Sequence, residues 1–417
     1  MICAQYPKHI TRNLNPGTHY LYFLYFHTAL KSKDMKISRK KILALAGLVG
    51  TSIILPSSNI YPYKTGFKGN DISGKASITY RKIKLNLGHK WTISRGSTDY
   101  KEDVFVYYEK GGITGIGEAS HMTGAGQNAD RTIEELKRII PFYLEADPFK
   151  FYELADKVNR EFEDISPAKA ALDIALFDWL GKKLNIPVHR LFGLDPGKYV
   201  DTSFSIGFDK PEILKQKVKE ADPYKILKVK LTNKNDEEII KTIRQVTDKP
   251  IRVDINEGWT NKKEAIKKIE WLAGNGVELV EQPMPVNMIK ETKWLKERSP
   301  VPIIADEAVN TSKDILPVAE AYNGINIKLM KSGGIMEAFR MAIIAGTFNL
   351  DIMIGCMIAS SVAISAAVQL QPLARWLDLD GSLLISNDPF TGARFHDGHW
   401  IMPEEPGIGV KEMPVSR

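Results

Sequence analysis

The C-terminal half of the chain repeats one unit, in which a short apolar segment is followed by a longer segment of helical character. Short apolar strands that alternate with helices predict parallel strands covered by helices. Eight such units favour an α/β fold with a (β/α)8-type barrel. The apolar segments recur about every 25 residues, at 201–207, 226–231, 251–255, 277–282, 302–307, 325–330, 351–355 and, more weakly, 374–380.

An open, doubly wound sheet is the alternative architecture. Such a sheet typically has a glycine-rich phosphate-binding turn after its first strand, and the sequence SIGFDKPE at 205–212 does not contain one. We therefore expect the barrel to occupy residues 199–380.

The region before the barrel has a different pattern. Residues 76–118 alternate like strands, and the pair Gly111–Gly112 between two such runs predicts a hairpin. Residues 130–192 have helical periodicity, with Ser166 and Pro167 as an N-cap and first-turn proline. An α+β domain is therefore expected at 76–198, and residues 381–417 form a separate C-terminal segment.

The net charge of +7 comes from the N-terminus alone. Residues 1–41 hold eight Lys and Arg and one acid, so the rest of the chain has equal numbers of basic and acidic residues. A neutral body without basic patches excludes nucleic acid as an expected partner.

The N-terminal region is typical of a targeting segment. A basic stretch that begins at Met35 is followed by apolar residues 42–55, which are too few to span a bilayer comfortably. The sequence SRK at 38–40 is similar to a twin-arginine export signal. We interpret residues 1–34 as a doubtful extension.

Residues 35–75 are interpreted as an export signal with its linker. We expect a periplasmic or otherwise exported protein without stable membrane insertion after export. The alternative is an amphipathic or buried helix at 42–55, in which case the protein is cytoplasmic. Only Cys356 lies outside the doubtful extension, so we expect no disulfide.

Charged residues stand at the ends of several apolar segments. Lys228 is followed by Asp254, Glu281 and Asp306 at steps of 26, 27 and 25 residues, about one barrel unit each. Each carboxylate is thus placed near the C-terminal end of a successive strand, where barrel active sites lie. Three converging carboxylates without nearby Cys or His favour a hard divalent cation, Mg²⁺ first.

Lys228 and Lys230 lie two residues apart on one expected strand, so their side chains share a face. Lys328 enters from a strand on the far side of the carboxylates. Cations on both sides of a metal-held carboxylate stabilise the enolate that forms when the adjacent carbon loses its proton. Neighbouring positive charges lower a lysine's pKa, so one lysine can act as a base. Bases on opposite faces of the carbon predict racemisation or epimerisation.

These motifs identify the chain as similar to the enolase superfamily. KVK at 228–230, VDINEGW at 253–259, VEQP at 280–283, ADE at 305–307 and NIKLMKSGG at 326–334 resemble its muconate-lactonising-type subgroup, and within it the dipeptide epimerases. With GITGIGEAS at 112–120, the resemblance covers nearly everything after residue 76. It implies that residues 76–198 form a capping domain over the barrel, completed by the C-terminal segment.

The resemblance also implies roles for individual residues. Asp254, Glu281 and Asp306 would bind one Mg²⁺ per active site, and Glu307 and Asn256 would support them. Lys230 and Lys328 would be the two acid/base catalysts. Lys228 would stabilise the substrate carboxylate and the enolate.

Substrate recognition is expected from two further places. Asp378 and Asp380 in WLDLDG resemble the pair that binds the free α-ammonium of a dipeptide, and the alternative is a solvated acidic turn. Arg95 corresponds to a family position that can bind an acidic side chain; alternatively, it ties down its own loop. Many family members carry an acid where Ala359 stands here, so the preference for the second residue can differ.

The resemblance implies an isomerase, a Mg²⁺-dependent epimerase of L-Ala-D/L-Glu-like or related peptides from cell-wall turnover. The alternatives are N-acylamino acid racemisation, o-succinylbenzoate synthesis, cycloisomerisation or a non-catalytic peptide-binding protein. The expected partner is a small dipeptide, and the sequence does not decide between a monomer and a homo-oligomer.

Overall fold

The structure, a computed structural model, describes residues 74–93, 96–121, 127–164, 167–207, 209–231 and 234–414. The doubtful extension, the export signal and nearly all of the linker lie outside these residues. The described residues form one compact unit, and the predicted domain boundaries within it stay a prediction.

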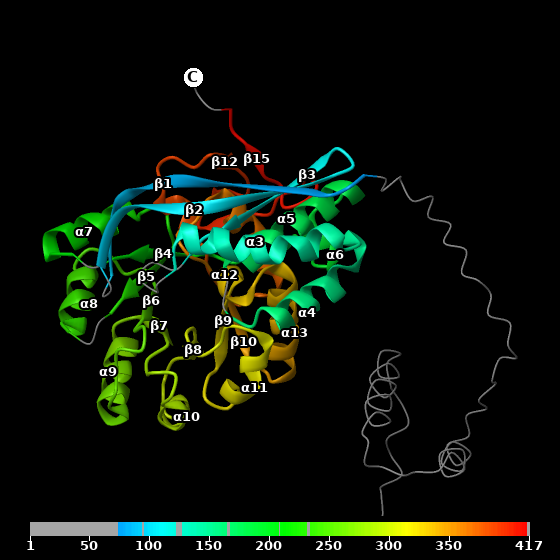
Figure 1. The fold of residues 1–417 in the computed structure, drawn as a ribbon. Coiled ribbons are helices and arrows are strands. Elements are labelled where there is room, and N and C mark those ends of the chain that lie inside the picture. Colours follow the sequence, from blue (N-terminus) through cyan, green and yellow to red (C-terminus); the bar gives the residue numbers. More distant parts are fainter. Residues whose placement is uncertain are drawn as a thin grey trace, which may run out of the picture. The chain divides into compact units, whose positions relative to one another are not determined.

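Eight parallel strands form the nearly closed barrel that the sequence predicted (Figure 1). They follow one another in sequence order around the sheet, and a parallel bridge between Thr202 and Leu377 brings the first strand next to the last. The strands are β4 (Ser203–Ile206), β5 (Ile226–Lys230), β6 (Ile251–Asp254), β7 (Val277–Glu281), β8 (Ile303–Ala305), β9 (Gly324–Lys328), β10 (Asp351–Gly355) and β11 (Trp376–Asp378).

Helices connect these strands and cover the outside of the barrel. Two of them have a side-chain N-cap: Asn261 accepts hydrogen bonds from the backbone of Lys263 and Glu264 at the start of α9, and Ser360 accepts one from Val362 at the start of α14. The helices are α7 (Pro211–Glu220), α8 (Asp236–Arg244), α9 (Lys262–Gly274), α10 (Ile289–Lys296), α11 (Ile315–Val318), α12 (Leu329–Ser332), α13 (Ile335–Thr347) and α14 (Ser361–Val368). Short 3-10 helices are η2 (Ser312–Asp314), η3 (Gln371–Leu373) and η4 (Gly381–Leu384).

The capping domain packs an antiparallel sheet against helices. Its strands are β1 (Ser77–Ile93), β2 (Gly96–Lys110) and β3 (Ile113–Ala119), and its helical elements are α3 (Ala129–Glu145), η1 (Pro148–Lys150), α4 (Phe151–Glu161), α5 (Pro167–Leu184) and α6 (Val188–Leu191). Gly111 and Gly112 have φ of 59° and 73°, which confirms the predicted hairpin between β2 and β3. Gly115 lets α5 approach β3 closely, because a Cβ there would collide with the carbonyl oxygen of Ala175.

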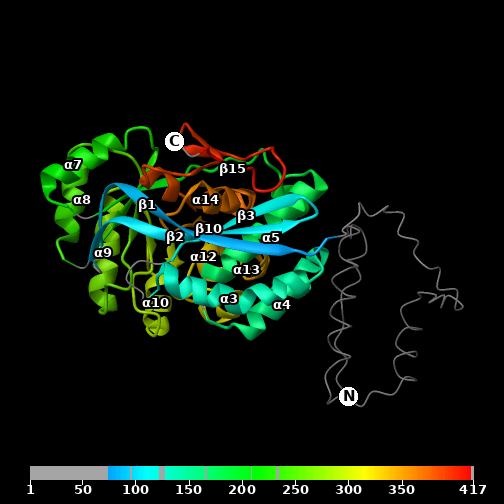
Figure 2. The same cartoon turned by 45° about the horizontal axis from the view of Figure 1, so that its top comes forward.

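The C-terminal segment returns to this sheet (Figures 1 and 2). Its strands are β12 (Phe390–Thr391), β13 (Arg394–His396), β14 (His399–Ile401) and β15 (Lys411–Glu412). The backbone nitrogen of Ser386 donates to the carbonyl oxygen of Asn86 at 2.9 Å, and Phe105 stacks on Phe390 at a centroid distance of 5.0 Å. The expectation that this segment completes the capping domain is thereby confirmed.

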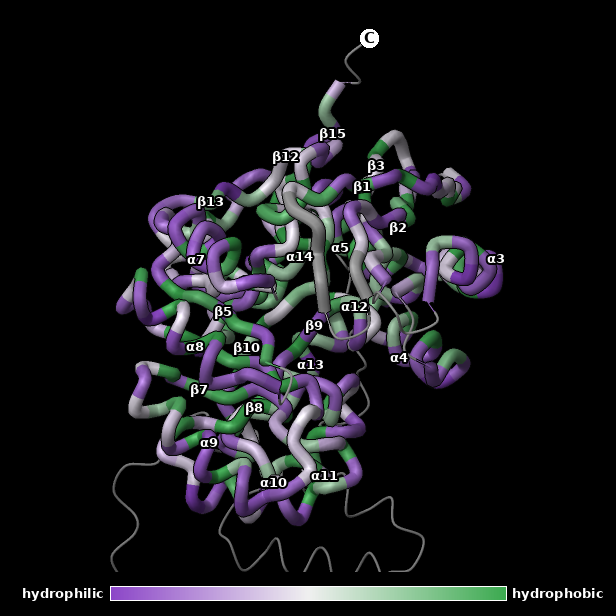
Figure 3. The backbone as a smooth tube through the Cα atoms, turned by 90° about the vertical axis from the view of Figure 1, so that its left-hand side faces the viewer, coloured by the Kyte–Doolittle hydropathy of each residue, from purple (hydrophilic) through white to green (hydrophobic). Residues whose placement is uncertain are grey.

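A small apolar cluster lies in the barrel interior below the charged strand ends. Leu279, Ile304, Met353 and Trp376 form a separate buried cluster. Three of them lie two residues before Glu281, Asp306 and Asp378, on the same strand face, so these acids stand directly above the cluster. Figure 3 shows hydrophobic residues along β7 and β8 and many hydrophilic ones along α9 and α10. None of the helices in the described part of the chain is long and apolar enough to cross a membrane.

Candidate active site

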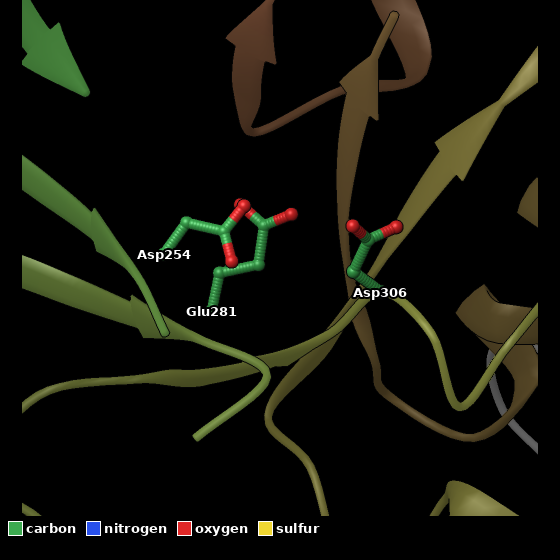
Figure 4. Close-up of side chains that lie close together, drawn as sticks. All are labelled: Asp254, Glu281 and Asp306. Atoms are coloured by element: carbon green, nitrogen blue, oxygen red, sulfur yellow. The ribbon is translucent and has the colours of Figure 1, made fainter. Parts of the chain in front are cut away.

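Three carboxylates meet at the C-terminal ends of neighbouring barrel strands (Figure 4). Asp254 ends β6, Glu281 ends β7 and Asp306 directly follows β8, and each offers an oxygen within 4.8 Å of the others. All three side chains are buried. An all-oxygen set of this kind suits a hard divalent cation, so the predicted convergence is confirmed and the cluster can hold a metal.

Lys228 and Lys230 approach this cluster from β5. Lys228 Nζ lies 2.7 Å from Glu281 Oε2 and 3.4 Å from Asp254 Oδ2, while Lys230 Nζ lies 2.5 Å from the same Asp254 oxygen. Both lysines therefore face the barrel interior, as their spacing predicted. The two positive charges are tolerated because carboxylates surround them.

Lys328 and Lys331 approach from the other side. Lys328, at the end of β9, has its Nζ 2.7 Å from Asp306 Oδ2. Lys331 is buried in α12, and its Nζ lies 2.6 Å from Asp306 Oδ1 and 3.1 Å from the carbonyl oxygen of Val309. Strands β5 and β9 flank β6, β7 and β8, so Lys230 and Lys328 stand on opposite sides of the carboxylate cluster.

The protein side chains alone do not lower the pKa of Lys228 or Lys328, and the expectation of a lowered lysine pKa beside a metal-loaded cluster stays a prediction. Burial alone would lower the pKa of Lys228, but the carboxylates of Asp378 and Glu281 raise it well above its usual value. Burial is likewise outweighed at Lys328, where Asp306 is the main cause of a raised pKa. The acids outnumber the bases here, and their field decides the direction.

Hydrogen bonds from neighbouring polar residues position the acidic residues of the cluster. Asn256 donates its backbone N–H to Asp254 Oδ1 at 3.0 Å and its side-chain Nδ2 to Glu307 Oε1, also at 3.0 Å. Asn326 donates to Glu281 Oε1 at 2.8 Å. Gln282 Oε1 accepts the backbone N–H of Asp306 at 2.9 Å. Asn256 and Glu307 thus lie where the resemblance implied.

Asp378 and Asp380 extend the cluster towards β4. Asp378 Oδ2 lies 2.6 Å from Lys228 Nζ, and its Oδ1 accepts a hydrogen bond from Ser203 at 2.8 Å. Asp380 Oδ2 accepts the backbone N–H of Ser205 at 2.7 Å. Both side chains are buried, at 5% and 4% exposure, so the alternative of a solvated turn is wrong.

The assembled charges show an excess of acid. The six carboxylates of the site stand against four lysines, which leaves a net charge of −2 when all groups are ionised. Burial and the carboxylate of Asp254 raise the pKa of Glu281 to about 7. Burial and Asp378 raise the pKa of Asp380 to about 6. One divalent cation would compensate this excess.

Three residues that contact the cluster were not singled out from the sequence: Gln282, Asn326 and Lys331. Each lies inside a motif used for the resemblance, in VEQP or NIKLMKSGG. The available signal was their position within one turn of a strand end that carries a charged residue.

The capping-domain predictions concern residues near the barrel mouth. Arg95 lies outside the described residues, as do residues 122–126. His121 is described, and its Nδ1 lies 3.8 Å from Asp103 Oδ1, within the capping domain. Burial and the nearby Lys101 lower the pKa of His121 to about 4, so it is neutral at neutral pH. Ala359 is buried.

Comparison with protein families gives two matches that together cover most of the chain. Residues 77–193 match the N-terminal domain of the mandelate racemase / muconate lactonizing enzyme family. Residues 213–413 match the family described as enolase C-terminal domain-like.

Individual relatives point the same way. The chain is 41% identical over 345 residues to the L-Ala-D/L-Glu epimerase of Bacteroides thetaiotaomicron. The aligned region covers 82% of this chain and 89% of that protein. The chain is 35% identical over 344 residues to a hydrophobic dipeptide epimerase of a Flavobacteria bacterium, covering 80% and 97%. The crystal structure of a dipeptide epimerase from Enterococcus faecalis with Mg and L-Leu-L-Tyr superposes with a TM-score of 0.76 at 29% identity, covering 81% of this chain and 100% of that one.

Proposed function

Because this chain belongs to the mandelate racemase and muconate lactonizing enzyme family of the enolase superfamily, we propose that it is a Mg²⁺-dependent dipeptide epimerase. The observation that carries the proposal is the arrangement of Lys230 and Lys328 on opposite sides of one carboxylate cluster. A buried Asp378–Asp380 pair beside that cluster supplies a place for a substrate ammonium.

Asp254, Glu281 and Asp306 would hold one Mg²⁺, which when bound supplies Lewis-acid stabilisation to a substrate carboxylate. The net charge of the surrounding side chains supports a single divalent ion. Asn256, Gln282, Asn326 and Lys331 keep the three carboxylates oriented through the contacts given above.

Lys230 and Lys328 would exchange the proton at the α-carbon. A divalent cation held by the carboxylates would offset the negative field that raises the pKa of Lys328. One lysine, in its neutral form, would then take the proton from Cα on one face, and the ammonium of the other would return a proton to the opposite face. Configuration at Cα is inverted when the two steps use different lysines. Lys228, which lies between Glu281 and Asp378, would stabilise the negative charge that develops on the substrate carboxylate.

Asp378 and Asp380 would bind the free ammonium of the dipeptide through charge-assisted hydrogen bonds. This role separates a dipeptide from the substrates of the alternative reactions, since an N-acylamino acid or a muconate carries no ammonium. Asp378 already pairs with Lys228, whereas Asp380 is buried and has no ion pair among the described residues. Burying a carboxylate without a cation partner is costly, which supports an ammonium-bearing substrate.

The finer parts of the proposal rest on the sequence. We propose that residues 35–75 direct export and that the dipeptides come from cell-wall turnover, with L-Ala-D/L-Glu-like peptides as one class. The names of the relatives given above refer to dipeptides with different side chains. Family membership alone therefore does not determine which dipeptide side chains this protein prefers.

The proposed function is tested by incubating the Mg²⁺-loaded protein with a dipeptide library in D₂O and measuring mass gain. Exchange at a single α-carbon, lost after EDTA treatment and restored by Mg²⁺, is the expected result. Absence of exchange with every free dipeptide, together with exchange of N-acylamino acids, would contradict it.

A further inference from the structure

A cavity of about 210 Å³ lies between strand β4 and the η4 turn, which directly follows Asp380. Strand β4, the chain after β10, the η4 turn and the far part of β1 contribute its walls, through Ser205, Ile358, Leu383 and Gly88 among others. The cavity is therefore shared between the barrel and the capping domain. None of the steps described above uses it.

Asp380 does not itself line the cavity, but residues of the cavity wall contact it. Ser205 lines the cavity, and its backbone N–H donates to Asp380 Oδ2 at 2.7 Å. The chain runs from Asp380 straight into the cavity wall, where Leu383 donates its N–H to the Asp380 carbonyl at 2.9 Å. On the other wall, burial and the carboxylate of Asp380 raise the pKa of Tyr224. A substituent attached next to an ammonium that is bound at Asp380 is thus only a few bonds from the cavity.

The lining is mostly apolar. Phe204 and Tyr224 stack in parallel, with ring centroids 4.1 Å apart and an interplanar angle of 7°, and Ile206 and Leu384 add aliphatic surface. Its charged members are both engaged with other side chains. Lys217 pairs with Asp209 at 3.1 Å, and Glu220 accepts a hydrogen bond from Gln216 at 2.9 Å. The cavity therefore offers a ligand apolar contact rather than a charge partner.

Size sets the class of ligand group. A dry apolar cavity of roughly 150 Å³ is enough to bind benzene. The present cavity is larger, so it accommodates a leucine or phenylalanine side chain, and an alanine methyl would leave most of it unfilled.

We propose that this cavity binds the side chain of the N-terminal residue of the dipeptide and selects a bulky apolar residue over alanine. The inference rests on the proposed function, because it needs the substrate ammonium at Asp378 and Asp380. In an α-amino acid the side chain leaves the carbon that carries the ammonium. An ammonium held by Asp380 therefore places the first side chain at the wall that Ser205 and Leu383 form.

The test compares Leu-Xaa with Ala-Xaa, with the same second residue, as competing substrates in D₂O. Filling the cavity with three more carbon atoms should raise kcat/KM for the Leu peptide roughly 10- to 100-fold over the Ala peptide.

A variant that fills the cavity from its own wall makes the test specific. A Cβ at Gly88 would have its nearest neighbour, the carbonyl oxygen of Leu384, at an ordinary 3.7 Å, so Gly88→Leu adds a side chain without a backbone clash. The Leu-to-Ala preference should fall at least tenfold in Gly88→Leu. The matched control is Gly274→Leu in α9, where a Cβ meets nothing within 4 Å and the cavity is not touched. Leu384→Trp is the second filling variant if Gly88→Leu does not fold.

The outcomes separate the two proposals. If free dipeptides exchange but the wild type favours Ala-Xaa, or if both filling variants keep the wild-type preference, the cavity has another use and only this inference is overturned. If no free dipeptide exchanges at all, the proposed function fails and the inference fails with it.

Discussion

Lys228 is the residue through which the two groups of carboxylates are joined. Its Nζ contacts Glu281 on the side of the three strand-end acids and Asp378 on the side of the ammonium pair. If the ammonium of a dipeptide lies at Asp378, the dipeptide backbone would therefore extend along Lys228 towards the three strand-end acids. At the scale of single residues, the order Asp378, Lys228, Glu281 would set the direction in which the proposed substrate lies.

The two proposed bases can be separated by substitution. Lys328→Ala should abolish epimerisation but leave Lys230 able to exchange the α-proton of one stereoisomer, and Lys230→Ala should leave the complementary exchange. The reason is that the two ammonium groups stand on opposite sides of the acids. Proton exchange in D₂O, followed separately for each stereoisomer by NMR, measures this. Full epimerase activity in either variant would remove that lysine from the mechanism.

Asp380→Asn tests the ammonium site. Removing one carboxylate that holds a buried cation should lower kcat/KM for a dipeptide on the order of 100-fold. An N-acetylated dipeptide should be a poor substrate of the wild type, and the variant should lose much less activity with it, because the charge partner is already absent. Equal rates with free and acetylated peptides in the wild type would instead favour an N-acylamino acid substrate.

At the scale of elements, capping-domain acids hold the N-termini of two barrel helices. Glu118 of β3 accepts hydrogen bonds from the backbone of Ser360 and Ala363 at 2.9 and 3.0 Å, at the start of α14. Asp173 of α5 accepts them from Ile335 and Met336 at 2.5 and 3.2 Å, at the start of α13. These helices follow β10 and β9, so the capping domain positions the chain that carries Lys328.

Asp173→Ala should therefore destabilise the protein. The substitution leaves two buried backbone N–H groups of α13 without an acceptor, which costs roughly 1–3 kcal/mol of unfolding free energy. Equilibrium denaturation in urea measures the loss. Asp222→Ala is the matched control, because the Asp222 side chain is 91% exposed and only approaches Lys249 at 3.6 Å, so its substitution should change stability by about 0.5 kcal/mol or less. Equal effects of the two substitutions would show that the cap contributes nothing.

At the scale of the whole molecule, the described part of the chain is a large compact unit whose one cysteine, Cys356, is free. Such a unit needs no oxidising compartment to fold. Export of a folded protein is therefore compatible with the leader that the sequence predicts, and the leader itself stays a prediction.

The leader can be tested with a reporter that must be exported folded. A chain starting at Met35 and fused to this reporter should reach the periplasm, and changing Arg39 and Lys40 to Gln should stop it, because the signal depends on its basic pair. Cell fractionation measures the distribution. A lysine-retaining control, Arg39→Lys, shows whether charge alone suffices. Retention of the intact fusion in the cytoplasm would assign the apolar residues 42–55 another role.

The sequence by itself determined the barrel and its main site. Apolar segments at a regular spacing can be recognised without knowledge of contacts, and a residue at the end of a parallel strand is carried to one end of the barrel whatever the details of packing. For this reason Asp254, Glu281, Asp306, Lys230 and Lys328 could be placed correctly from their spacing.

Only the tertiary structure decided which side chains touch. Lys331, Asn326 and Gln282 reach the acids because of side-chain direction and the stagger between neighbouring strands, which no local pattern encodes. The burial of Asp380 and the cavity next to it depend on β1 and η4, which are about 300 residues apart in sequence and pack together over β4. The electrostatic outcome, lysines with raised pKa among excess acid, is likewise a property of the assembled site, because Coulomb interactions depend on distances that exist only after folding.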